Sequence, residues 1–298
     1  MGKAERNRRQ SAREKIAEQQ AAARRAEVRR QMLLVGGSIV VVLAIVVAFV
    51  VIKISGSPAK AGPTAGGKTA AAVQHDLATV PAATLAAVGK GATYPDAVQT
   101  IKTVSTPLTS GGKPEIVYVG AEYCPYCAAE RWAIVTALSR FGTFSGLGLI
   151  HSSATDTDAN TPTLTFLKAS YQSKYVVFST TEAETVLEKP LQKISAADAG
   201  LMAKYDIPPY VPTTADNGAY PFVDFGNKYV IDGASYDPTV LAGKSWTQIA
   251  TALRDPSSPI ATGADGAANL ITAAICKLTG NQPASACTPT VKALEGSI

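Results

Sequence analysis

Cysteine and histidine are scarce in this sequence, which has four Cys and two His among its 298 residues. No cysteine lies among the first hundred residues, and His75 and His151 are isolated. A structural zinc site needs four ligands at workable spacing, and these two histidines do not complete one. Internal repeats are also absent, which excludes a solenoid or a propeller.

The part of the chain that is expected to fold, after residue 31, has no excess of positive charge. The formal net charge is +5, but residues 1–31 hold ten Lys or Arg against four Glu. The remaining 267 residues therefore carry a balance of about minus one. Nucleic-acid binding depends on basic surface, so no nucleic-acid partner is expected for the folded part.

A long run without charge follows this basic tail. Residues 32–52 (MLLVGGSIVVVLAIVVAFVVI) span roughly 30 Å as a helix, which is the thickness of a bilayer's hydrocarbon core. The excess of basic residues before the run favours a cytoplasmic N-terminus. We therefore expect a basic cytoplasmic tail over residues 1–31, a single transmembrane anchor in membrane lipid over residues 32–53, and a main domain outside the cytoplasm.

A cleaved signal peptide is the alternative interpretation, because Ala59-Lys60-Ala61 offers a small-x-small cleavage pattern. The apolar run is too long and its charged leader far too long for such a peptide, which favours an uncleaved anchor. Residues 54–72 are rich in Gly, Pro, Ala and Ser and are predicted to form a flexible tether. The extracytoplasmic domain is expected over residues 73–298.

The strongest secondary-structure signals lie just beyond residue 112. Residues 115–123 (EIVYVGAEY) are apolar, β-branched and aromatic, which predicts a buried strand. Residues 124–142 carry a helical apolar stripe, and residues 147–153 read as a second strand. Strand, helix and strand in this order predict a βαβ unit with parallel strands, and hence an α/β fold.

Later segments complete the expected domain. Residues 163–182 alternate in two runs around Gln172-Ser173, which suggests a hairpin. Residues 221–233 (PFVDFGNKYVIDG) predict a second hairpin that turns at Gly226-Asn227. Helices are expected over residues 194–207, 245–255 and 268–278.

Cys124 and Cys127 stand where the predicted strand meets the predicted helix. Their spacing places both sulfurs on the first helical turn, where they can interconvert between dithiol and disulfide. The free N–H groups and positive dipole end of a helix N-terminus favour a thiolate at Cys124. Pro125 fits the first helical position. The pattern predicts Cys124 as the nucleophile and Cys127 as the resolving thiol.

Two other interpretations of this pair stay open. The pair is typical of half a zinc site, although Cys276 and Cys287 have the wrong separation to supply the other half. It is also compatible with a plain disulfide that never turns over. The strand-then-helix setting favours the redox-active interpretation, which requires no metal and no organic cofactor.

The segment VYVGAEYCPYC, followed by a helix, resembles the active-site segment of thioredoxin-fold proteins, and CPYC itself is similar to the motif of glutaredoxins. PFVDFGNKYVIDG resembles the family's strand pair that begins with a cis-proline facing the active site. The resemblance implies that Pro221 is this proline and that Tyr220 offers backbone hydrogen bonds to a thiol substrate.

The same resemblance implies a thioredoxin-like fold for the whole domain. As a whole, the chain resembles a family of membrane-anchored extracytoplasmic thioredoxin-like proteins. The implied parts are a core over residues 112–151 and 220–255, a DsbA-like insertion over residues 152–219 and a C-terminal extension over residues 256–298.

One position departs from the family pattern. Thioredoxins carry a buried carboxylate six residues before the first cysteine, where this chain has Tyr118. The usual proton acceptor for the resolving thiol is therefore missing, and Glu122 and Glu130 are the carboxylates that could replace it through water. Oxidase, reductase and isomerase directions all stay open.

Two further features have a structural and a functional interpretation. Cys276 and Cys287 flank turn residues and are expected to form a structural disulfide, with a second redox relay as the alternative. Tyr126, between the first two cysteines, is expected to contact the unfolded chain of a substrate, with a spacer that tunes potential as the alternative.

These features together predict an enzyme, a membrane-anchored thiol–disulfide oxidoreductase. Its expected partners are cysteine-containing exported or membrane proteins and a membrane redox partner that resets the 124–127 pair. The rival hypothesis is a non-catalytic, membrane-tethered accessory domain in which 124–127 is a structural disulfide.

Overall fold

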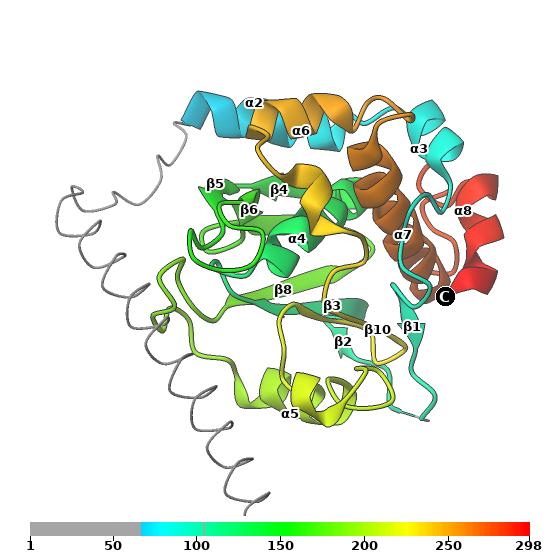
Figure 1. Ribbon diagram of the computed structural model, residues 1–298. Helices are drawn as coiled ribbons and strands as arrows, with labels where there is room; N and C mark the ends of the chain where they lie inside the picture. Colours follow the sequence, from blue (N-terminus) through cyan, green and yellow to red (C-terminus); the bar gives the residue numbers. More distant parts are fainter. Residues whose placement is uncertain (1–66, 104) are drawn as a thin grey trace, which may run out of the picture. The chain divides into compact units, whose positions relative to one another are not determined.

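The computed structural model describes residues 67–103 and 105–298 of the chain. Its centre is a six-stranded mixed sheet in which β3 pairs antiparallel with β9 and parallel with β8 (Figure 1). Two separate two-stranded sheets pair β4 with β7 and β5 with β6. The strands are β1 (Gln99–Thr100), β2 (Thr109–Ser110), β3 (Lys113–Gly120), β4 (Gly142–Ser145), β5 (Gly148–His151), β6 (Pro162–Thr165), β7 (Ser170–Ser173), β8 (Val177–Glu182), β9 (Phe222–Phe225) and β10 (Tyr229–Asp232).

Helices lie on both faces of the central sheet, with α5 on one face and α4 and α7 on the other (Figure 1). The helices are α2 (Gly67–Ala78), α3 (Ala82–Val88), α4 (Pro125–Leu138), α5 (Ala196–Tyr205), α6 (Trp246–Ala252), α7 (Gly266–Leu278) and α8 (Pro289–Ala293). Single turns are η1 (Thr214–Asp216), η2 (Pro238–Leu241), η3 (Ala261–Asp265) and η4 (Leu294–Ser297). The expected α/β class is confirmed.

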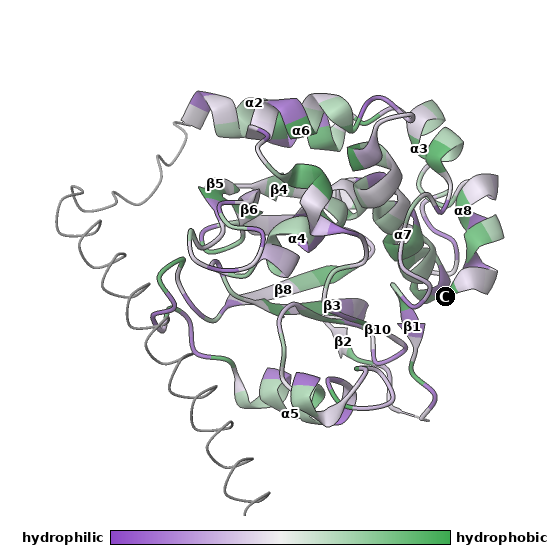
Figure 2. Ribbon diagram, in the orientation of Figure 1, coloured by the Kyte–Doolittle hydropathy of each residue, from purple (hydrophilic) through white to green (hydrophobic). Residues whose placement is uncertain are grey.

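The central strand β3 faces a different hydrophobic core on each side of the sheet. Val117 and Val119 pack in the cluster that contains residues of α5, whereas Ile116 and Tyr118 belong to the cluster of α4 and α7. Successive side chains of a strand point to opposite faces, so a strand buried on both faces is apolar throughout. Figure 2 shows this concentration of hydrophobic residues along β3.

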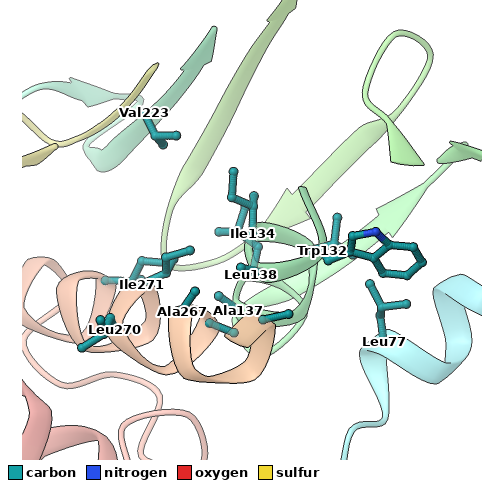
Figure 3. Packing of buried hydrophobic residues seen from close by; sticks show 14 of the residues in the cluster. Leu77, Trp132, Ile134, Ala137, Leu138, Val223, Ala267, Leu270 and Ile271 are labelled. Carbon is teal, nitrogen blue, oxygen red and sulfur yellow. The ribbon is translucent and has the colours of Figure 1, made fainter. Parts of the chain in front are cut away.

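The helix that follows β3 is buried along nearly its whole length. Helix α7 packs against α4, where Ala137 and Leu138 of α4 lie close to Ala267 and Ile271 of α7 (Figure 3). Small alanine side chains allow the two helices to approach each other closely. The expected helices over residues 124–142 and 268–278 are therefore present as α4 and α7. Their contact with each other holds α4 against the central sheet.

The expected hairpin near the end of the sheet is also present. Strands β9 and β10 pair antiparallel and turn at Gly226 and Asn227, whose φ angles are 64° and 56°. The Lys228 N–H donates to the Phe225 oxygen at 3.0 Å and closes the turn, and glycine and asparagine are the residues that most readily adopt positive φ at its two central positions. Asp224 Oδ1 accepts the Asn227 N–H at 2.8 Å and holds the turn. Helices α5 and α6 match the predictions for residues 194–207 and 245–255, and Ser245 caps α6.

The parallel partner of β3 differs from the prediction. Strand β5, expected to complete the βαβ unit, instead pairs antiparallel with β6 in a small separate sheet. The parallel strand is β8, which aligns Gly120 with Glu182. The hairpin expected around Gln172-Ser173 is also wrong, because β7 pairs with β4. Local alternation marks a strand but carries no information about which distant strand lies beside it.

This change of partner also corrects the predicted domain boundaries. Residues 152–219, expected to be an insertion outside the core, contain β8, which is a strand of the central sheet. The segment between α4 and β8 instead contains the two small sheets, so the strands outside the central sheet fall between residues 142 and 173.

Three N-terminal predictions concern residues at or beyond the described part. The basic tail over residues 1–31, the anchor over residues 32–53 and the tether before residue 67 lie outside it. The tether prediction is wrong for residues 67–72, which form the start of α2. Val73 and Leu77 of this helix are one turn apart and buried in the core, and this packing stabilises the helix. Within the described residues, no helix is both long and apolar enough to cross a bilayer.

Candidate active site

Cys124 and Cys127 lie at the junction between β3 and α4, as the sequence predicts. Cys124 is the N-cap residue of α4, and its Sγ accepts the Cys127 backbone N–H at 3.2 Å. Pro125 occupies the first turn, where its missing N–H costs no helical hydrogen bond. Both thiols are free, and their exposed fractions are 5% for Cys124 and 0% for Cys127. Both thiols are therefore buried, and only Cys124 keeps a small exposed area.

The two thiols have pKa values shifted in opposite directions. A hydrogen bond from the Cys127 thiol lowers the pKa of Cys124 and outweighs the effect of burial, and the Arg131 charge acts in the same direction. Burial raises the pKa of the Cys127 thiol well above its ordinary value, and the neighbouring Cys124 raises it further. A proton shared by the pair therefore resides on Cys127, and the negative charge on Cys124.

Tyr220 and Pro221 reach this site from the loop before β9. The peptide bond between them is cis, as the resemblance implies. In its thiol form Cys124 donates to the backbone oxygen of Tyr220 at 3.4 Å. The Tyr220 side chain packs against the cluster of Ala121, Cys124 and Cys127. The structure thus brings together residues that are 96 positions apart in the chain.

Cys276 and Cys287 are bonded to each other, with an S–S distance of 1.98 Å. They belong to the large core around α4 and α7, while Cys124 and Cys127 form a separate cluster with Ala121. The C-terminal pair therefore joins α7 to the segment before α8 and contributes no sulfur to the candidate site.

An exposed aromatic side chain, Tyr126, lies beside the thiol pair. In the described part of the chain, three large apolar side chains are strongly exposed: Tyr94 at 45%, Tyr126 at 44% and Leu187 at 71%. Tyr126 lies between the two cysteines. Burial, then Asp237 and then Tyr126 raise the pKa of Tyr94.

Leu187 belongs to a loop that is attached directly to the active-site turn. The backbone oxygen of Glu184 in this loop accepts the Glu122 N–H at 2.8 Å. A second loop is attached in the same way, because Ser153 N–H donates to the Tyr123 oxygen at 2.8 Å. Loops after β8 and β5 therefore border the cysteine pair on a common edge of the protein.

The carboxylates considered as proton acceptors have other partners. Glu130 is fully buried and accepts from the backbone N–H of Ser235 at 2.8 Å and from its hydroxyl at 3.1 Å. Burial raises the pKa of Glu130 to about 7. Glu122 accepts from the Thr165 hydroxyl at 2.8 Å, and burial raises its pKa as well. Neither carboxylate is hydrogen-bonded to a cysteine.

A buried ion pair beneath the cysteines was missed in the sequence. Arg131 Nε donates to Glu182 Oε1 at 3.1 Å and Nη2 to Glu182 Oε2 at 2.6 Å, and both side chains are 0% exposed. Arg131 stands four residues after Cys127, a helical spacing that could have indicated it. Glu182 gave no such signal, because its strand was assigned to an insertion.

The described residues contain no group of three or more His, Cys, Asp or Glu side chains arranged to hold a metal ion. His151 packs against Trp246, with ring centroids 4.4 Å apart, and burial lowers its pKa. The arrangement at Cys124 is that of two free thiols with pKa values shifted in opposite directions, with the exposed Tyr126 between them.

Comparison with known proteins gives one match. The profile of a family described as a domain of unknown function (DUF929) matches residues 99–277. The matched segment runs from β1 to nearly the end of α7 and includes the cysteine pair, Tyr220, Pro221 and the Arg131–Glu182 pair. No curated protein and no solved structure matches the chain.

Proposed function

The chain belongs to the family described as a domain of unknown function, DUF929, and we propose that it is a membrane-anchored thiol–disulfide oxidoreductase with a thioredoxin-like fold. The observation that carries this proposal is a pair of free cysteines at one helix N-terminus, with Cys124 as the N-cap and in contact with the Tyr220 backbone oxygen; the opposite shifts of the two thiol pKa values agree with it. A low-pKa thiol beside a high-pKa thiol is the combination that attacks and then resolves a mixed disulfide.

The chemistry proceeds in two exchanges in the oxidising direction. The 124–127 disulfide is attacked at Cys124 by a substrate thiolate, so a substrate–Cys124 disulfide forms and Cys127 leaves as a thiolate. A second substrate thiolate then attacks the substrate sulfur of the mixed disulfide and releases Cys124 as a thiolate. The substrate loses two electrons, and the pair gains them as a dithiol. The same steps in reverse reduce a substrate disulfide.

The order of the central strands supports the thioredoxin-like proposal. Strands β8, β3, β9 and β10 are adjacent in that order; β8 runs parallel to β3, β9 runs antiparallel to β3, and β10 runs antiparallel to β9. The cysteine pair follows β3, and Pro221 immediately precedes β9. Both positions agree with the family resemblance and support the proposal.

The surface around the pair supports a protein substrate. The exposed Tyr126, between the two cysteines, and the half-buried Tyr220, packed against Cys124, provide an aromatic contact next to the reacting sulfur. Exposed large apolar side chains in one area are typical of interaction sites. We assign this surface to the unfolded or extended segment of an exported or membrane protein that carries the reacting cysteine.

A redox titration of the purified full-length protein tests the proposed activity. In glutathione buffers of graded potential, the 124–127 pair is expected to pass reversibly between disulfide and dithiol, as measured by thiol alkylation and peptide mapping. The buried Cys276–Cys287 disulfide is the internal control and should stay oxidised over the same range. If the 124–127 pair also stays oxidised throughout, the accessory-domain hypothesis is favoured instead.

The proposed location follows from the charge asymmetry around residues 32–53. A reporter enzyme that is active only outside the cytoplasm should be active when fused after residue 298. It should be inactive when fused at residue 20, because the basic tail stays in the cytoplasm. Cell fractionation of both fusions controls for expression. Reporter activity at residue 20 would contradict the proposed topology.

A proposed partner follows from the stoichiometry of this reaction. Each substrate oxidised leaves the pair as a dithiol, so another redox protein must accept two electrons before the next cycle. Outside the cytoplasm no glutathione buffer is assured. We assign this role to a membrane redox partner that meets the same exposed edge.

A further inference from the structure

Arg131 and Glu182 lie directly behind the two cysteines. Ala121 joins the two groups, since it packs against Cys124 and Cys127 while its backbone oxygen accepts Arg131 Nη2 at 2.9 Å. Arg131 and Cys127 are four residues apart on α4, so their side chains share one face of the helix. The guanidinium thus stands next to the thiol that has no access to solvent.

The hydrogen bonds of Arg131 leave part of its charge available. Nε and Nη2 are occupied by Glu182 and by Ala121, whereas Nη1 is buried and has no partner among the described residues. The Tyr118 hydroxyl nearby is likewise buried and without a partner, and Arg131 lies over its ring at 5.8 Å from the centroid. Buried polar groups are nearly always hydrogen-bonded, so two free donors at one place need an explanation.

A species that could use these donors arises during thiol–disulfide exchange. When the 124–127 disulfide is attacked at Cys124, the S–S bond breaks and its electron pair stays on Cys127. Cys127 is 0% exposed, so this thiolate forms without water to solvate it. A buried anion is very costly unless it is paired and hydrogen-bonded.

We propose that Arg131, held in place by Glu182, stabilises the buried Cys127 thiolate during thiol–disulfide exchange. This inference rests on the proposed function. Glu182 acts as a positioning residue: its two hydrogen bonds orient the guanidinium, and its backbone is fixed beside Gly120 by the pairing of β8 with β3. Tyr118, whose pKa burial raises well above its ordinary value, remains a phenol and offers a second donor.

The test follows the two steps separately with dithiobis(nitrobenzoate). In the reduced full-length protein, Cys124 thiolate attacks this reagent, forms a mixed disulfide and releases one nitrothiobenzoate. Cys127 must then lose its proton to solvent and attack Cys124, which forms the 124–127 disulfide and releases a second nitrothiobenzoate. The absorbance of the product therefore reports each thiol in turn.

Two variants test the charges beneath the thiols: one removes both the positive and the negative charge, and the other removes the negative charge only. Arg131→Met combined with Glu182→Gln removes both charges, and we expect the pKa of Cys124 to rise by about one unit and the second release to slow about tenfold. Glu182→Gln alone keeps a side-chain oxygen that accepts from Arg131 and still positions it, but it leaves the Arg131 charge uncompensated, so the pKa of Cys124 should fall and the second release should not slow. The pH dependence of the first release measures the pKa.

Glu130→Gln is the matched control, because Glu130 is the preceding residue of α4, equally buried, and bonded to Ser235 instead. It should leave both releases unchanged. If the double variant releases both equivalents like the parent protein, Arg131 is only structural and the inference is overturned. If the parent protein releases a single equivalent, the pair cannot close, and the proposed function itself fails.

Discussion

Replacing Cys127 with serine is expected to leave the protein covalently joined to its substrates through Cys124. Cys124 has the lowered pKa and, unlike Cys127, a small exposed area, so it still attacks a substrate disulfide. Without the Cys127 sulfur, nothing inside the protein can attack the resulting mixed disulfide. In cells that express Cys127→Ser, mixed disulfides should accumulate and turnover should fall to background.

Cys124→Ser is the matched variant and should trap few partners, because the remaining Cys127 thiol is fully buried and keeps its proton. Acid quenching, alkylation and non-reducing electrophoresis measure the trapped species, which a reductant should release. Trapping by Cys124→Ser in place of Cys127→Ser would mean that the roles of the two cysteines are reversed.

Breaking the buried ion pair from one side is expected to cost about 3–5 kcal/mol of unfolding free energy. Arg131→Met leaves the Glu182 carboxylate buried without its cation and without the hydrogen bonds from Nε and Nη2. Because the pair joins α4 to β8, the loss should affect the whole sheet. Urea denaturation of the full-length variant, followed by circular dichroism, measures the change.

The double variant Arg131→Met with Glu182→Gln should recover much of that loss. It removes both charges, and glutamine retains an acceptor for the Phe166 N–H, which now donates to Glu182 Oε1 at 3.1 Å. Replacing both members of a buried pair is often nearly neutral. Arg131→Met costing less than about 1 kcal/mol would indicate a pair exposed to water, against the burial of both side chains.

Local features of this protein were predictable from the sequence. The strand before Cys124, the helix after it and the turn at Gly226-Asn227 all match, because apolar periodicity, the helix N-terminus and positive-φ turns act over a few neighbouring residues. The position of Tyr220 near Cys124 was predictable only through the family resemblance.

The sequence-based predictions were wrong where the structure of a segment depends on residues far away in the sequence. Strand β5 looked like the partner of β3, but β8 takes that place, and β5 is used in a small separate sheet. Residues 67–72 were predicted to be part of a tether, but they form the first turns of α2. This helix is stabilised because Val73 and Leu77, which follow them, are buried in the core. The amino-acid composition of a segment does not show which surface of the folded protein that segment packs against.

By itself, the sequence determined that two cysteines occupy the start of a helix behind a buried strand, since capping and strand periodicity are encoded locally. Only the tertiary structure decided what surrounds them. It brings Glu182 to Arg131 across 51 positions and Tyr220 to Cys124 across 96. Such contacts are selected by how completely all strands and helices bury their apolar faces together, and a buried charge is stable only where that packing supplies its partner.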